Sequence, residues 1–461
     1  MEVIRLVESK ILSVSENILE FLKDGISYHD LEAHLKKDLD QLGCELLKIV
    51  LESLDHQQRN SEVRKRTWTV VRKNDRKEIL TPFGLLSYAR SYYRHKESKE
   101  YCYLVDEKAG IAPHSRVSES LKAELSETCS GVSYEKATLH ISRYNTALKV
   151  SRQTVSNCVK SFKAKPPTQL KEKRRVQELY IEADEDHLKI RGKRGAQARL
   201  IYIHEGVSEH PRRHLVNARY FTTVQKKPEE FWMEVCDYIE AHYDLDNLSA
   251  VYLSGDGASW IRTGQEYIPG SIFILDKFHL AKSIIRATAH APALRKAIYR
   301  GIKQVNKQGV LHHLAEALEL AETRPRQERV FASISYVTNN WDGIEAATKY
   351  PHVGCSAEGH VSHILSARLS SRPMAWSRQG AENMALMRSV QANRESIRDH
   401  YLAMQPVAPV IVELKTAVQQ ELKHLRKRAV GKENHNNVPL YQGGHNYTRQ
   451  ALKAINGITA I

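Results

Sequence analysis

The sequence predicts an α/β fold, and three observations lead to this prediction. Five apolar segments of strand length lie between residues 179 and 280, and a helical pattern that begins at Pro228 separates the third from the fourth. The last two segments each run into an acid. Three strands that read as antiparallel, one helix and two further strands are the outline of a ribonuclease-H-like core. The five segments are residues 179–188, 198–207, 214–224, 250–257 and 271–280.

The chain before this core is expected to be helical, then β, then helical again. In residues 1–60 apolar side chains recur at the spacing of one helix face. Residues 61–114 alternate in a β manner around an Asn-Asp turn, with arginines and tyrosines on the strands. Residues 115–162 return to helix. A basic stretch with a proline pair, residues 163–178, predicts a linker.

Residues 115–162 also contain the outline of a helix-turn-helix. Ser133 is suited to cap a helix that extends to about Tyr144, and after a short link Ser151 begins a second helix. The second helix carries polar residues of types that bind phosphates and base edges. An ordinary helical hairpin fits the pattern equally well. The polar residues are Arg152, Gln153, Ser156 and Asn157.

Length and composition bound the class of protein. At 461 residues the chain is long enough for two to four domains, and its net charge of +15 favours a polyanionic partner, usually nucleic acid. A merely basic surface is the alternative. The six cysteines form no Cys-x-x-Cys pair, which argues against a zinc ribbon or a disulfide framework. The N-terminus is too charged for a signal peptide and no apolar run reaches membrane length, so we expect a cytoplasmic protein with no membrane partner.

Three of the predicted strands end at carboxylates: Asp184, Asp256 and Asp276. Asp256 stands between two glycines, so an ordinary Asp-Gly turn is the alternative to a metal ligand. Asp184 and Asp256 would end neighbouring strands, and paired carboxylates suit Mg²⁺ and phosphoryl chemistry. A third acid is expected from residues 352–388, a segment rich in small residues, His, Arg and Ser. Glu358 is the candidate there and Glu382 its rival.

Five ordered motifs carry a family resemblance. The stretches "IEADEDHL", "YLSGDGASWI", "ILDKFHL", "GCSAEGHVSHILSARLSSRPMAWS" and "GAENMALMR" resemble bacterial insertion-sequence transposases of the Lre type, which belong with the Mutator-like DDE transposases. The resemblance implies a ribonuclease-H-like core in residues 179–284 and 341–400, interrupted by a helical insertion at residues 285–340. A basic helix and tail follow in residues 401–461.

The same resemblance implies the roles of individual residues. It places the catalytic, metal-binding acids on Asp184, Asp256 and Glu358, with Mg²⁺ as cofactor and Mn²⁺ as a substitute. The family's Asp-x-x-His signature falls on Asp276 and His279, and His279 would orient Asp256 or the scissile phosphate. One departure is that neighbouring acids in "ADEDH" allow the first assignment to shift to Asp186.

The resemblance also implies what the protein binds and where it works. The partners would be terminal inverted repeats and target DNA, bound by a homo-oligomer associated with the bacterial nucleoid. Arg368 and Arg372 would contact phosphates. Trp260 and Trp376 are expected to be packing groups, and the His360 and His363 pattern lacks the second ligand pair that a zinc site needs. A structure-specific nuclease and a non-catalytic DNA-binding regulator remain as alternatives.

Overall fold

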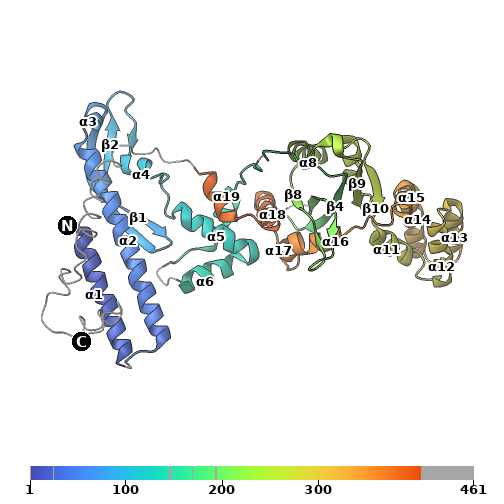
Figure 1. Cartoon of the computed structure of the whole chain (residues 1–461), viewed down its shortest axis with the longest axis horizontal. Coiled ribbons are helices and arrows are strands. Elements are labelled where there is room, and N and C mark those ends of the chain that lie inside the picture. Colours follow the sequence, from blue (N-terminus) through green and yellow to red (C-terminus); the bar gives the residue numbers. More distant parts are fainter. Residues whose placement is uncertain (1, 24, 145–147, 169, 193–194, 406–461) are drawn as a thin grey trace. The chain divides into compact units, whose positions relative to one another are not determined.

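The computed structural model describes residues 2–405 except 24, 145–147, 169 and 193–194, and these residues form two compact units (Figure 1). The first unit contains residues up to 125 and residues 134–155. The second contains residues 126–133 and 156–404. Strands and helices occur in both, so the predicted α/β class is confirmed. The C-terminal helix and tail expected at residues 401–461 lie outside the described residues from residue 406 onward.

The first unit begins with two long helices, α1 (Glu2–Leu22) and α2 (Tyr28–Asn60), which pack against each other. Helix α2 begins at a capping box, in which Ser27 accepts from the backbone of Asp30 and Asp30 accepts from the backbone of Ser27. Its buried leucines lie against a three-stranded antiparallel sheet. The strands are β1 (Trp68–Thr81), β2 (Gly84–His95) and β3 (Tyr101–Cys102), and the short α3 (Glu62–Thr67) precedes them.

The predicted position of the hairpin turn in this sheet is wrong. The Asn-Asp pair lies inside β1, and the chain reverses at residues 82–83, between Thr81 and Gly84. Asn74 has a φ of +59°, a conformation that asparagine tolerates, and the β1–β2 register shifts beside it. The pair therefore forms a bulge within a long strand. Asparagine favours the bulge for the same reason that it favours a turn, namely that it tolerates positive φ.

Helices follow this sheet, as predicted. They are α4 (Leu104–Lys108), α5 (Glu119–Gly131), α6 (Tyr134–Tyr144) and α7 (Arg152–Ser161). Helices α6 and α7 match the two helices expected around residues 133–144 and 151–160. The side chain of Ser151 accepts a hydrogen bond from the backbone of Thr154 at 3.1 Å, which is the expected N-terminal cap.

The second unit is organised by a five-stranded sheet with the order β10-β9-β4-β5-β8. Strands β4, β5 and β8 are antiparallel neighbours, and β9 and β10 continue the sheet parallel to β4. The strands are β4 (Glu178–Leu188), β5 (Ala196–His204), β8 (Arg219–Thr223), β9 (Ala250–Gly255) and β10 (Ile272–Leu275). A small hairpin, β6 (Val207–Ser208) and β7 (His214–Leu215), connects β5 to β8.

The two faces of the sheet differ because side chains alternate along each strand. On β4, Leu179, Ile181 and Ala183 belong to the main apolar core, which α8 (Pro228–His242) completes with fully buried residues such as Trp232. Every second residue, from Tyr180 through Asp184, points to the opposite face. There α16 (Ala357–Val361) contacts β4 and α18 (Arg378–Ala392) contacts β8.

Helices also fill the segment between β10 and α16, which is where the insertion is expected. Helix α15 packs against β10, and α11 packs against α14. No helix among the described residues is long and apolar enough to cross a membrane. The helices here are α11 (Lys277–Ala287), α12 (Arg295–Lys303), α13 (Lys307–Glu319), α14 (Arg324–Asn339) and α15 (Trp341–Lys349). The remaining elements of this unit are η1 (Leu245–Asn247), α9 (Ser259–Arg262), α10 (Gly264–Tyr267), η2 (Pro292–Leu294), the π-helical turn η3 (Ser362–Ser366), α17 (Ala367–Leu369) and α19 (Ile397–Ala403).

Candidate functional site

Two aspartates lie side by side on neighbouring parallel strands. The β4–β9 register pairs Glu182 with Ser254, so Asp184 and Asp256, each two residues further along, occupy corresponding positions. Asp256 directly follows the last residue of β9, as predicted. Asp184 is only 8% exposed and lies inside β4, which continues to Leu188, so the prediction that a strand ends at Asp184 is wrong. The parallel strands therefore bring together two acids that are 72 positions apart in the sequence.

The Asp184 carboxyl group is unusually easy to protonate. Its pKa is raised to about 6, mainly by burial, and the charges of Asp256 and Glu185 contribute to this rise. A hydrogen bond from the backbone of Glu185, at 2.8 Å, and the nearby His279 act in the opposite direction. The favourable contacts of Asp184 therefore do not offset its burial and its repulsion from Asp256 and Glu185. A bound cation would stabilise the ionised carboxylate.

The glycines around Asp256 serve the close packing of the strand end. A Cβ on Gly255 would lie 3.0 Å from the Ala183 carbonyl oxygen. Gly257 has a φ of +89°, and a Cβ there would lie 2.3 Å from the side-chain oxygen of Asn340. The Asp256 carboxylate accepts a hydrogen bond from the backbone of Ala258 at 2.8 Å. The segment is therefore a tight turn, and this turn holds its acid beside Asp184.

A histidine–aspartate pair adjoins the two acids. Asp276 caps α11, and its Oδ2 lies 2.7 Å from Nδ1 of His279. This hydrogen bond is the main cause of the raised pKa of His279, and the charges of Asp184 and Asp256 add to it. The protonated ring would place positive charge near two carboxylates and remain able to donate from its other nitrogen.

The alternative first acid, Asp186, lies on the same face of β4 as Asp184. Its Oδ2 is buried without a hydrogen-bond partner within the described structure. Glu185 points to the other face, where it accepts a hydrogen bond from the indole of Trp260. The structure thus separates Glu185 from the site and leaves Asp184 and Asp186 on one side.

The two candidates for the third acid have different surroundings. Glu382 is engaged at the end of β8, where it accepts hydrogen bonds from the backbone of Val224 and Gln225 and from the hydroxyl of Thr223. Glu358 is exposed on α16, the helix that lies against β4. The geometry therefore favours Glu358 as the acid that is available to a ligand.

The carboxylates supply hard oxygen ligands, which fit Mg²⁺ or Mn²⁺. Among the described residues, the three predicted acids, Asp184, Asp256 and Glu358, do not form a group whose oxygens all lie within 4.8 Å of one another. The group that does meet this spacing is His312, His313 and Glu316 on α13. The strand register brings Asp184 and Asp256 together, and Glu358 is on the helix that contacts β4.

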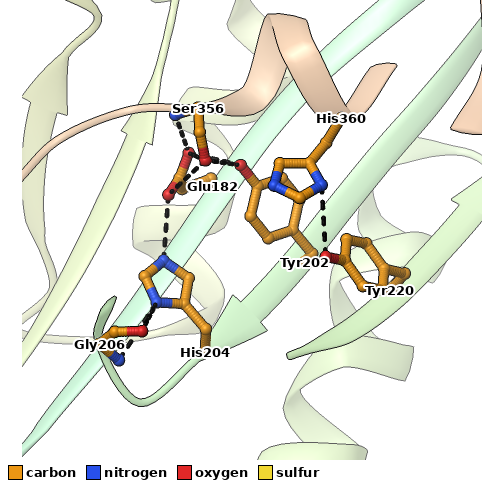
Figure 2. A network of polar contacts seen from close by, with 7 residues as sticks. All are labelled: Glu182, Tyr202, His204, Gly206, Tyr220, Ser356 and His360. Carbon is orange, nitrogen blue, oxygen red and sulfur yellow. Dashed lines mark hydrogen bonds and ion pairs between the residues drawn. The ribbon is translucent and has the colours of Figure 1, made fainter. Parts of the chain in front are cut away.

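A polar network joins α16 to the sheet next to these acids, and Figure 2 shows it. Glu182 accepts hydrogen bonds from His204 Nε2 at 3.0 Å, from the Tyr202 hydroxyl at 2.5 Å, and from the backbone and hydroxyl of Ser356. Burial alone would raise the pKa of Glu182, but these hydrogen bonds outweigh it and hold the pKa below its usual value. Glu182 is consequently an ionised anchor for the start of α16.

The role of Glu182 is not among the predictions from the sequence, because Glu182 is one of several neighbouring acids in "IEADEDHL". Alternation along β4 was the available signal, because it places Glu182 on the same face as Asp184. The partner Ser356 lies 174 residues away, and nothing local indicates it.

The residues predicted to contact DNA from α7 are mostly on the surface. Arg152, Gln153 and Asn157 are exposed, and Ser156 is half-buried. Arg152 lies 3.8 Å from Glu135 on α6, an exposed ion pair of little energetic weight.

One predicted phosphate contact is corrected by the structure. Arg368 is 7% exposed, its Nε donates to the Cys129 carbonyl oxygen at 3.0 Å, and its guanidinium stacks over Trp376. It is a buried structural arginine, whereas Arg372 is exposed. The expected packing role of both tryptophans is confirmed: Trp260 is 4% and Trp376 7% exposed.

Comparison with known proteins places this architecture in a family. A model of the "Uncharacterised protein family (UPF0236)" matches residues 21–405. UPF0236 protein TTE2489 of Caldanaerobacter subterraneus subsp. tengcongensis is 35% identical over 451 residues, which cover 94% of this chain and 96% of that protein. A second protein of that organism, whose name joins eleven TTE designations, is 35% identical over 443 residues, 92% of this chain and 93% of its own length. The "UPF0236 protein in vanSb 3'region" of Streptococcus gallolyticus is 25% identical over 399 residues, 83% of this chain and 87% of its own.

Proposed function

Because the chain belongs to the uncharacterised protein family UPF0236, we propose its function from the geometry of its own site: it is a DNA transposase of an insertion sequence. Asp184, Asp256 and Glu358 bind Mg²⁺, for which Mn²⁺ can substitute. The enzyme hydrolyses the phosphodiester at the element ends and joins the freed 3′-hydroxyl to target DNA. The observation that carries this proposal is the parallel register of β4 and β9, which sets the buried Asp184 of β4 beside Asp256, the residue directly after β9.

The sheet topology supports the finer assignment of a ribonuclease-H-like core. Three antiparallel strands, β4, β5 and β8, are followed after α8 by two strands parallel to β4. The resulting order, with the first strand in the middle, agrees with the outline inferred from the sequence. Helices α11 to α14 come between the last strand and Glu358, as the insertion of the resembled transposases requires.

The names of the relatives support a mobile element. One relative carries eleven designations under a single name and another carries four. Copies of one sequence at several places in a genome are the expected product of transposition. We infer from this that the present chain too is the product of an element that multiplies.

The proposed reaction makes specific demands on the chain. Bound divalent cations supply activation of the attacking oxygen and stabilisation of the leaving oxygen. Asp184 and Asp256 would hold the divalent cations in place. His279, whose ring is oriented by its hydrogen bond to Asp276, can donate a hydrogen bond to a phosphate oxygen. Water attacks in the first step and the freed 3′-hydroxyl in the second. Both are in-line displacements without a covalent enzyme intermediate, so catalysis rests on positioning and charge neutralisation.

We propose two surfaces for the terminal inverted repeats. One is the helix-turn-helix of α6 and α7, and the other is on the sheet of the first unit. On the strands, the exposed Arg72 lies 4.6 Å from the ring of Tyr92, and Arg94 lies 6.0 Å from the ring of Tyr101. Such arginines can bind phosphates while their stems remain held by rings. A homo-oligomer is expected, since two element ends must be joined.

The test is cleavage of a labelled duplex that carries the terminal repeat and its flank, with Mg²⁺, by wild type and by Asp256→Asn. We expect wild type to nick at the element boundary and the variant to bind equally well without nicking. An added labelled target duplex should become joined to the nicked strand. Cleavage without joining would indicate a structure-specific nuclease, and equal binding with no cleavage by either protein would indicate a regulator.

A further inference from the structure

A continuous row of aromatic rings crosses one face of the second unit's sheet, and nothing in the proposed chemistry uses it. The rings come from β9, β4, β5 and β8. Figure 2 shows the part of the row on β5 and β8, where His360 of α16 lies over the rings of Tyr202 and Tyr220. The centroid distances are 5.3 Å for Tyr252–Tyr180, 5.2 Å for Tyr180–His204, 6.1 Å for Tyr202–His204, 5.2 Å for Tyr202–Tyr220, 4.6 Å for Tyr202–His360 and 5.4 Å for Tyr220–His360.

A cavity of about 1360 Å³ opens on this face. Tyr180, Tyr220 and His360 line it and are half-buried, whereas the other rings of the row, Tyr202, His204 and Tyr252, are almost fully buried and support them from below. Most of the other lining residues lie within 206–218, 351–356 and 392–394. This volume exceeds the roughly 300–1,000 Å³ of typical small-molecule clefts. The cavity is therefore of a size for a short polymer segment.

Positive charge is available at the cavity wall. Lys277 and Arg394 line it, are exposed, and form no ion pair with any described residue. The two acids of the lining are already engaged: Glu182 holds the polar network, and Glu209 lies 3.8 Å from Arg213. Lys277 and Arg394 are therefore available to bind an anionic ligand.

The wall segment that carries Arg394 is held in a defined conformation. The Asn393 side chain accepts from the backbone of Tyr220 at 2.8 Å and donates to its carbonyl oxygen at 3.0 Å. Arg394 itself has a φ of +58°, an uncommon conformation for a residue with a side chain. The fold thus fixes a cation beside Tyr220 at some conformational cost.

The cavity is next to the acids of the candidate site. Glu182 lines it, and Asp184 lies two residues along the same strand on the same face, a rise of about 7 Å. Lys277 of the cavity wall directly follows Asp276. A polymer in the cavity would extend towards Asp184 and Asp256.

We propose that this cavity binds unpaired nucleotides of a DNA strand, with the half-buried rings of Tyr180, Tyr220 and His360 as stacking partners. Lys277 and Arg394 would bind the phosphates. Stacking platforms combined with a cationic wall are how proteins hold single strands without reading their sequence. The proposal rests on the proposed function in one respect, namely that the strand is the one whose scissile phosphate reaches the acids. It adds that DNA must be locally unpaired there.

The experiment measures binding of a fluorescein-labelled oligothymidine of about 12 nucleotides to the full chain by fluorescence anisotropy. The variant is Lys277→Ala/Arg394→Ala. The matched control is Lys296→Ala/Arg300→Ala, which removes one exposed lysine and one exposed arginine from α12, outside the cavity. We expect the cavity variant to bind about tenfold more weakly, with a salt dependence less steep by about 1.4 in the log–log slope, and the control to bind like wild type.

Stacking has its own test at Tyr220. Tyr220→Phe keeps the ring and should bind like wild type, whereas Tyr220→Leu should lose about tenfold in affinity. An oligonucleotide with abasic sites should bind both variants and wild type equally weakly. Thermal unfolding of each variant shows that the fold is retained.

The outcomes separate this proposal from the proposed function. If the cavity variant binds oligothymidine like wild type, or if the α12 control loses as much affinity, the cavity is not the site. An oligouridine bound more tightly than oligothymidine would assign the cavity to RNA and overturn the proposal. None of these results depends on cleavage, because anisotropy reports binding of an oligothymidine that carries no terminal repeat to be cut.

Discussion

At Asp184 the folded chain holds a proton more tightly than the unfolded chain does. The pKa is about 6 in the fold against 3.8 for an ordinary aspartate. Between these values the folded state binds more protons, so stability falls as pH rises from about 4 to about 6, and the full cost remains above that window. The shift corresponds to about 3 kcal/mol at most. An acid that destabilises its own fold at neutral pH is typical of a functional position.

Asp184→Asn should therefore stabilise the protein against urea at about pH 7.5 in EDTA, and the gain should shrink at about pH 5. The reason is that the amide keeps the shape of the side chain without the buried charge. Added Mn²⁺ should stabilise wild type and leave the variant unaffected. Asp246→Asn, at an exposed acid, is the control. Equal gains at both pH values would contradict the prediction.

The third acid gives a second prediction at this scale. Glu358→Gln should abolish cleavage without changing the unfolding midpoint, because Glu358 is exposed. Glu382→Gln should lower stability by about 1–3 kcal/mol, because its carboxylate accepts from the backbone of Val224 and Gln225. Both variants are compared by cleavage and by urea unfolding. Cleavage retained by Glu358→Gln and lost by Glu382→Gln at wild-type stability would reverse the assignment.

At the scale of elements, the short helix α16 depends on a partner outside itself. Helix α16 continues directly into η3 and α17, and even this continuous segment is short for a helix that is stable on its own. Its start is bound to β4 through Ser356, whose backbone and hydroxyl both donate to Glu182. The position of Glu358 is thus set by a strand residue two places before Asp184. Glu182 is a positioning residue in this account.

Glu182→Gln should loosen this attachment, because an amide replaces one of two acceptor oxygens and faces donors. We expect a loss of about 2 kcal/mol in the free energy of unfolding, faster backbone hydrogen exchange in residues 351–361, and slower cleavage. Glu178→Gln is the matched control on the same strand and face, since Glu178 accepts only from the hydroxyls of Tyr180 and Tyr252. Exchange in residues 351–361 that is unchanged by Glu182→Gln would remove the anchoring role.

Sequence patterns predicted the elements better than their connections. Apolar periodicity located α1, α2, α6, α7 and the five strands of the second unit's sheet. The prediction of a hairpin turn at the Asn-Asp pair in β1 is wrong, because asparagine at positive φ occurs both in turns and in bulges. A turn and a bulge differ in what the next strand pairs with, and that is not a local property.

At the scale of the molecule, the net charge of +15 supports a polyanionic partner for the chain as a whole. Several basic side chains have instead become structural, as Arg368 shows by its bond to the Cys129 carbonyl and its stacking on Trp376. Others, such as Lys277 and Arg394, stay exposed at a cavity wall. Total charge indicates the class of partner, whereas only the fold separates binding cations from packing ones.

The sequence by itself determined the α/β class, the order of the elements and the pairing of Asp184 with Asp256. It could do so because apolar runs define strands, and parallel neighbours bring their carboxyl ends to one edge of a sheet. Only the tertiary structure decided that Arg368 is buried, that Glu382 is bound to the end of β8, and that Glu182 holds α16. Each of these depends on groups more than 150 residues apart, and their meeting follows from packing that no local pattern encodes.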